Sequence, residues 1–135
     1  MQPQNRHWSR RLALQALYQW QLSGHSIDEL LAQYVEDENW LKADKDYFVD
    51  LVSQSISQEE TLTNIFSPYL DLQPEQIDPI ERAILLFATY EIMQKPETPT
   101  KVVLSEAINL CKKFGSIDGY KFINGVLDKV ALLRT

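Results

Sequence analysis

The sequence predicts an all-α protein, and three observations lead to that prediction. Apolar residues recur at i, i+3, i+4 and i+7 along most of the 135 residues, which is the period of an amphipathic helix. Helix-capping residues precede several of these runs, and glycine or proline follows them. Even Asn124-Gly125, a typical hairpin turn, is flanked by residues with helical period. We therefore expect a bundle of about six to seven helices.

The first half of the chain contains three predicted helical segments. The first covers residues 9–24, SRRLALQALYQWQLSG, and Gly24 ends it. Ser26 and Glu29 form a capping box that begins a second helix. A long segment from about residue 44 to 70 follows, and we expect two helices there, broken near residues 58–61.

The second half has clearer helix boundaries. Asp78-Pro79-Ile80-Glu81 combines an Asp cap, a proline in the first turn and a glutamate three residues after the cap. Pro96 ends that helix, another runs from about Thr100 to Gly115, and the last runs from about Asp118 to Leu133. The proline-containing stretch 67–79 is the expected joint, which gives one domain with subdomains of about 1–70 and 71–135.

Length and composition fit an ordinary globular protein. A chain of this size buries a core without disulfides, and 44% hydrophobic with 24% charged residues is typical. The single cysteine, Cys111, excludes an internal disulfide, and there is no C-x-x-C. Without a signal peptide or a long apolar run, we expect a cytoplasmic protein with no membrane partner.

Catalytic, metal and cofactor sites are not predicted. His7 and His25 lack metal-spaced partners, and no glycine-rich phosphate-binding motif occurs. Cys111 falls on the apolar stripe of its helix and fits a small core residue better than a nucleophile. We expect no enzyme activity.

Charge is distributed unevenly along the chain, although the net charge is −6. Residues 1–22 contain three arginines and no acidic residue, and residues 112–135 contain five basic and two acidic ones. The stretch 23–111 holds five basic and seventeen acidic residues. Two basic ends allow contact with nucleic acid that the average charge conceals.

The N-terminal basic arm mixes charge with rings. Arg6, Arg10 and Arg11 supply cations for phosphate, while His7 and Trp8 between them supply rings that stack on bases. The alternative is a disordered tail that only makes the protein more soluble.

The last predicted helix carries the second candidate surface. Its apolar stripe places Lys121 toward solvent and Phe122 on the flank, where the ring is either core or an exposed platform. From the residues alone, core is the better reading, since aromatic side chains at helical spacing usually pack. Gly125 interrupts this helix at a cost of up to about 1 kcal/mol relative to alanine, and we expect close packing to offset it.

Four segments together resemble a known family. ALQALYQWQLS at 13–23, ERAILLFATYE at 81–91, SEAINLCKKFG at 105–115 and DGYKFINGVLDK at 118–129 are similar to the NusB family of bacterial transcription antitermination factors. The resemblance covers essentially the whole chain and implies a compact NusB-like helical bundle with two small subdomains.

The resemblance also implies a function. Members bind the boxA element of ribosomal RNA operon transcripts as single-stranded RNA, together with the ribosomal protein NusE, in an antitermination complex with RNA polymerase. This N-terminal arm has fewer arginines than relatives with a denser cluster, because His7 and Trp8 stand where such relatives carry further arginines. The resemblance also favours the platform reading of the last helix, in which Gly125 keeps a side chain out of the way either of RNA or of a neighbouring helix. The expected RNA-binding residues are Arg6, Arg10, Arg11, Asp118, Lys121 and Phe122.

NusE binding is expected on the acidic middle of the chain, because a ribosomal protein is basic. Glu81 matches a family position at that contact and is also a helix-capping residue; Tyr18 and Glu91 are further candidates. One alternative is a protein-binding helical adapter without direct RNA contact. Another is a fragment of a ribosomal RNA methyltransferase, since NusB-like domains also occur fused to such enzymes; we expect no methylation here.

Overall fold

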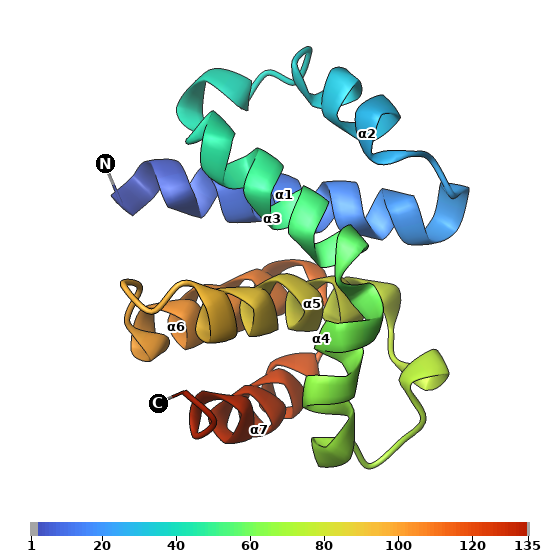
Figure 1. Ribbon diagram of the computed structural model, residues 1–135, viewed down its shortest axis with the longest axis vertical. Coiled ribbons are helices and arrows are strands. Elements are labelled where there is room, and N and C mark those ends of the chain that lie inside the picture. Colours follow the sequence, from blue (N-terminus) through green and yellow to red (C-terminus); the bar gives the residue numbers. More distant parts are fainter. Residues whose placement is uncertain (1–2, 135) are drawn as a thin grey trace. The chain divides into compact units, whose positions relative to one another are not determined.

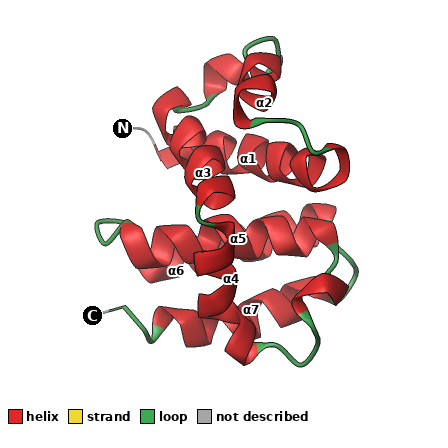
Figure 2. Cartoon of the chain, turned by 45° about the vertical axis from the view of Figure 1, so that its right-hand side comes forward, coloured by secondary structure: helices red, strands yellow, loops and turns green. Residues whose placement is uncertain are grey.

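The computed structural model describes residues 3–134, which are largely helical (Figure 1). These residues contain seven α-helices, three short 3-10 helices and no strand (Figure 2), so the predicted fold class is confirmed. The α-helices are α1 Pro3–Ser23, α2 Ile27–Tyr34, α3 Lys45–Ser57, α4 Glu59–Phe66, α5 Pro79–Gln94, α6 Thr100–Phe114 and α7 Gly119–Ala131. The 3-10 helices are η1 Trp40–Lys42, η2 Ser67–Tyr69 and η3 Pro74–Gln76.

The chain divides into two compact units, Met1–Ser57 and Gln58–Thr135. The predicted break within residues 44–70 is found at Gln58, between α3 and α4. The boundary between the units lies there as well, earlier than the joint expected at residues 67–79. The reason is that α4 packs against α5 and α7 and so belongs to the C-terminal unit.

The N-terminal unit forms around the packing of α1 against α3, with α2 in contact with both. The Phe48 ring lies at its centre, 5.4 Å from the Tyr34 ring and 5.4 Å from the nearly perpendicular Trp40 ring. The predicted capping box at the start of α2 is present: Glu29 N–H donates to Ser26 Oγ (3.2 Å), and Ser26 N–H donates to Glu29 Oε1 (3.1 Å). The Ser26 N–H also lowers the pKa of the Glu29 carboxyl.

The N-terminal basic segment is a helix fixed to the rest of its unit. Asp44 N–H donates to the Asn5 carbonyl (3.1 Å), and Ser9 Oγ donates to the Asp44 carbonyl (2.6 Å). Both contacts join the first turns of α1 to the start of α3. The disordered-tail alternative is therefore wrong for the described residues; Met1 and Gln2 lie outside them.

The C-terminal unit forms around α5, which contacts α4, α6 and α7. All residues from Ala83 to Ile92 are buried. Asp78 caps α5 as predicted, accepting from Ile80 N–H at 2.8 Å and Glu81 N–H at 3.3 Å. Cys111 is a fully buried core residue, and burial, with nearby Glu81 and Asp78, raises the pKa of its thiol to about 11.

Arg134 holds the C-terminal end of α5. Its guanidinium donates to the carbonyls of Ile92 (2.8 Å), Thr98 (2.6 Å), Glu91 (3.2 Å) and Lys95 (3.3 Å). The last carbonyls of a helix lack partners inside it and attract positive charge. One of the C-terminal cations counted for RNA binding therefore has a structural role.

Arg134→Ala should lower the free energy of unfolding by about 1–3 kcal/mol, because these carbonyls lose a charged donor. Arg134→Lys should lose most of the same energy, since one ammonium cannot reproduce the planar fork. Urea unfolding measures both. Lys101→Ala, at an exposed position on α6, is the control and should change stability by less than about 0.5 kcal/mol. Equal stability of Arg134→Ala and the control would contradict this role.

Candidate nucleic-acid interface

The three arginines of α1 have different environments. The Arg6 guanidinium lies 4.3 Å from the centre of the Tyr47 ring, and that of Arg10 lies 5.6 Å from the same ring. Arg10 is only 2% exposed, so it does not offer its charge to a ligand at the surface. Arg6 and Arg11 are half-buried and reach the surface in part.

Cations from two elements lie against the Trp8 ring. The Arg11 guanidinium lies 5.0 Å from the centre of the Trp8 ring, and Lys42 Nζ from η1 lies 4.6 Å from it. His7 meets the same ring edge-on at 5.9 Å. Lys42 is exposed and extends the predicted basic surface. The distribution of charge along the sequence did not reveal it, because Lys42 lies in the acidic middle of the chain.

A second cationic surface lies in the C-terminal unit. Tyr120 on α7 is approached by Lys112 Nζ at 4.8 Å and by Lys121 Nζ at 6.0 Å. Lys121 Nζ also lies 3.4 Å from Asp118 Oδ1, with both side chains largely exposed. In the described chain, Asp118 pairs with this lysine instead of capping α7 with its side chain.

Phe122 and Gly125 differ from the expectations drawn from the residues alone. Phe122 is half-buried, so one part of its ring packs and another part faces solvent. The close packing expected at Gly125 is wrong: apart from its chain neighbours and the adjacent backbone of α7, no atom of the described residues would lie within 4 Å of a Cβ built there. The residue is exposed, so packing does not offset the cost of a glycine within α7.

Glu81 fixes the loop before α7. Its side chain is 6% exposed, and its Oε2 accepts from Ser116 N–H (3.2 Å) and Ser116 Oγ (2.8 Å). Gly119, the first residue of α7, permits this approach, because a Cβ there would overlap Glu81 Oε2 and lie 2.8 Å from Glu81 Cδ. The carboxylate therefore determines where α7 begins.

The other two candidates for protein contact have opposite exposure. Tyr18 on α1 is 37% exposed and presents its ring to solvent. Glu91 on α5 is fully buried. Of the three residues expected at the NusE contact, Tyr18 alone is exposed.

Comparisons with known proteins identify the family. A model of the NusB family matches residues 7–132. The transcription antitermination protein NusB of Alcanivorax borkumensis is 41% identical over 96% of this chain and 86% of its own. That of Cupriavidus pinatubonensis is 44% identical over 93% and 75%. The chain belongs to the NusB family.

Solved structures agree with this NusB assignment. NusB from T. maritima superposes with a TM-score of 0.86 at 25% identity, covering 96% of this chain and 92% of that one. A crystal structure of the antitermination factors NusB and NusE in complex with dsRNA gives a TM-score of 0.86 at 26% identity, covering 95% and 96%. The NusB fold is therefore shared along almost the whole chain.

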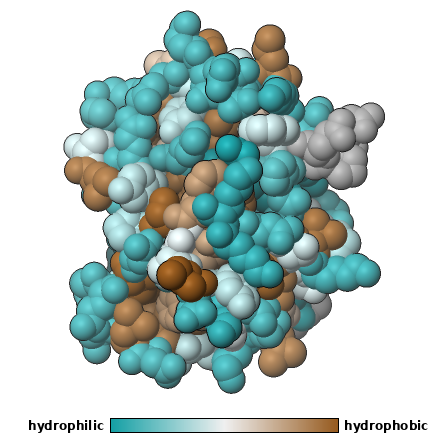
Figure 3. All heavy atoms as spheres, turned by 180° about the vertical axis from the view of Figure 1, so that it is seen from behind, coloured by the Kyte–Doolittle hydropathy of each residue, from teal (hydrophilic) through white to brown (hydrophobic). Residues whose placement is uncertain are grey.

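The described part of this NusB family member contains neither a metal-binding cluster nor a helix that could span a membrane. Within residues 3–134, no group of three His, Cys, Asp or Glu side chains could hold a metal ion. None of the helices that the structure describes is long and apolar enough to cross a membrane. The face drawn in Figure 3 is mostly hydrophilic, with apolar residues interspersed.

Two glycines on α7 provide a matched pair of substitutions. Gly119→Ala should lower the free energy of unfolding by about 1–3 kcal/mol, because the new methyl group displaces the buried Glu81 carboxylate. Gly125→Ala should raise it by up to about 1 kcal/mol, because alanine favours the helix and meets open space. Thermal unfolding of both variants measures the difference. Stabilisation by Gly119→Ala would show that the carboxylate does not hold the start of α7.

Proposed function

We propose that the protein is a transcription antitermination factor that binds the boxA element of ribosomal RNA operon transcripts together with NusE. The observation that carries the proposal is the exposed face of α7. There, the accessible part of the Phe122 ring lies next to exposed Lys121, and Lys129 follows two turns later. An aromatic face beside cations is the combination that binds unpaired bases and their phosphates.

The cations of the N-terminal unit give further support. Arg6, Arg11 and Lys42 reach the surface and are ordered on rings, so little side-chain freedom remains to be lost on binding phosphate. Arg10 contributes indirectly, by packing on Tyr47 and fixing the helix that carries the other two. Asp118 orients Lys121.

The proposed ligand is single-stranded RNA. The structural relative that contains NusE holds dsRNA. Stacking on Phe122, however, requires a base that can leave its neighbours, and the bases of a duplex cannot. Direct comparison of the two RNA forms tests this choice.

The proposed protein partner is NusE, which the structural relative also contains. Tyr18 offers an exposed ring for the contact, and an acidic protein surface favours encounter with a basic ribosomal protein. Glu81 acts from inside the protein by fixing the loop before α7, and buried Glu91 acts only through the packing of α5. By linkage, each ligand then raises the apparent affinity of the other.

This function requires no catalysis and no cofactor. The protein acts on a nascent transcript within an RNA polymerase complex, which places it in the bacterial cytoplasm. The second candidate, a protein-binding adapter without RNA contact, is favoured by the exposure of Tyr18 alone. RNA binding separates the two candidates.

Phe122→Ala should weaken binding of a labelled boxA RNA by about fivefold to a hundredfold, because stacking contributes about 1–3 kcal/mol per base. Helicity and NusE binding should be unchanged, since the ring is only half-buried. Fluorescence anisotropy at several salt concentrations, with and without NusE, measures the effect. A duplex of the same sequence should bind more weakly, and equal binding by parent and variant would favour the adapter.

Lys42→Ala should lower RNA affinity severalfold and reduce the slope of log affinity against log salt by about one, because one phosphate contact is lost. Circular dichroism should show an unchanged fold, since Lys42 is exposed. Lys101→Ala removes an exposed lysine from α6 and is the matched control. An identical salt slope in both variants would exclude Lys42 from the RNA surface.

A further inference from the structure

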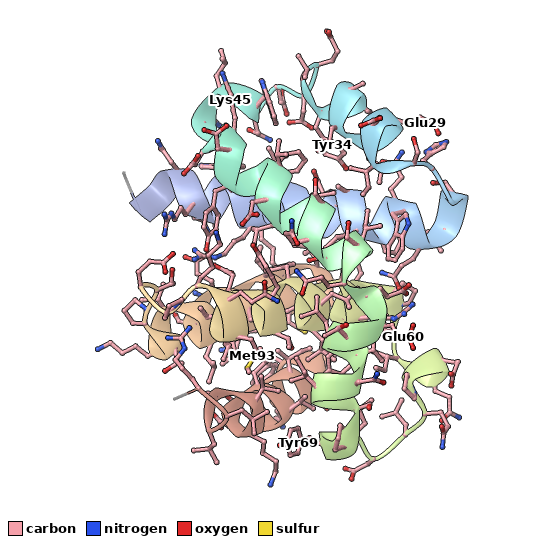
Figure 4. The ribbon with its side chains drawn as sticks, in the orientation of Figure 1. Glu29, Tyr34, Lys45, Glu60, Tyr69 and Met93 are labelled. Atoms are coloured by element: carbon pink, nitrogen blue, oxygen red, sulfur yellow. The ribbon has the colours of Figure 1, made fainter. Side chains whose placement is uncertain are left out.

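The C-terminal unit has a hollow beside α7, and Lys121, Phe122 and Lys129, which carry the proposed function, line part of it. It has a volume of about 260 Å³. One side comes from the end of η2 and the residues after it, including Tyr69, which Figure 4 labels, and the other side comes from α7. The lining residues are Tyr69, Asp71, Lys121, Phe122, Gly125, Val126 and Lys129.

Gly125 keeps this hollow open. It lies between Lys121 and Lys129, four residues from each, so the two lysines stand about 12 Å apart along one row of the helix. Apart from its two chain neighbours and the adjacent backbone of α7, no atom of the described residues lies within 4 Å of where its Cβ would be, so the missing side chain does not serve packing inside the protein. A helix-weakening residue at an exposed position without a packing role indicates that the space itself is used.

We propose that the hollow is a subsite for one unpaired nucleotide, whose base enters over Gly125 and stacks against Phe122 while its flanking phosphates lie against Lys121 and Lys129. This inference rests on the proposed function, that the protein binds RNA. It adds the position of one base and assigns roles to Gly125, Lys129, Tyr69 and Asp71.

The lining determines which part of the nucleotide enters. Asp71 repels phosphate, so the phosphates are restricted to the lysine row of α7. A carboxylate accepts hydrogen bonds, so Asp71 favours a base edge that carries N–H groups. Tyr69 supplies a second ring on the wall opposite α7. A planar base with donors on one edge satisfies all of these groups, and a lone phosphate does not.

Gly125→Leu tests the subsite by filling it. Leucine favours helix, so the thermal midpoint should stay the same or rise, while affinity for a labelled single-stranded boxA RNA, measured with NusE present, should fall about fivefold to a hundredfold. Asn124→Leu adds the same side chain at the neighbouring exposed position, outside the hollow, and should bind like the parent. A variant that gains stability and loses RNA affinity cannot be explained by unfolding.

A set of RNAs with one abasic nucleotide each identifies the base. Where the abasic nucleotide is the one that occupies the hollow, the affinity of the parent protein for the RNA should fall by the same fivefold to hundredfold. With that RNA, Gly125→Leu should cause no further loss of affinity. A second measurement uses the parent protein, without any substitution. The chain has four glycines, so their amide signals are readily distinguished by NMR, and that of Gly125 should shift on RNA addition while that of Gly24 does not.

Three results would overturn the subsite and leave the proposed function standing. Parent-like RNA binding by Gly125→Leu, with a loss for Phe122→Ala, would remove the hollow and leave the proposed function intact. If Gly125→Leu weakens NusE binding and leaves RNA binding unchanged, the hollow is a site for a protein partner. An unmoved Gly125 amide at saturating RNA would also exclude it. If the parent binds no RNA even with NusE, the proposed function fails, and the subsite fails with it.

Discussion

The buried carboxylate of Glu81 is the interaction on which the α7 surface depends. A carboxylate inside a protein is costly unless donors surround it, and Ser116 provides two, from its backbone and its hydroxyl. Gly119 gives the carboxylate room where any side chain would overlap it. Because α7 starts at Gly119, this contact fixes the start of the helix on which Lys121 and Gly125 are exposed and Phe122 is half-buried.

Both units hold cations on aromatic rings, and this suits a protein with a net charge of −6. An aromatic ring positions a cation without placing a negative charge beside it. Trp8 does this for Arg11 and Lys42, and Tyr120 does it for Lys112. Basic surfaces can therefore persist among nineteen acidic residues. Lys121 differs, because Asp118 also pairs with it.

Local features of the fold were predictable, and features that depend on distant residues were not. The capping box of Ser26, the Asp78 cap and the break at Gln58 follow from residues within one turn of each other. The proximity of Lys42 to Trp8, the burial of Arg10 and the use of Arg134 at the end of α5 depend on packing between separate helices. Summing charge along the chain therefore counted Arg10 and Arg134 as available and overlooked Lys42.

The position of Glu81 also suggests how two ligands of the C-terminal unit could communicate. The residue lies in the first turn of α5, which Asp78 caps, and its carboxylate reaches the loop that begins α7. A partner that binds at the start of α5 and displaces it would move that carboxylate. The start of α7 would then shift as well, because Gly119 is in close contact with the carboxylate. If RNA binds α7 as proposed, linkage requires that it stabilise the same arrangement of α5 to an equal extent. The expected role of Glu81 in the NusE contact is therefore compatible with its burial, since a buried residue can transmit a contact that it does not itself make.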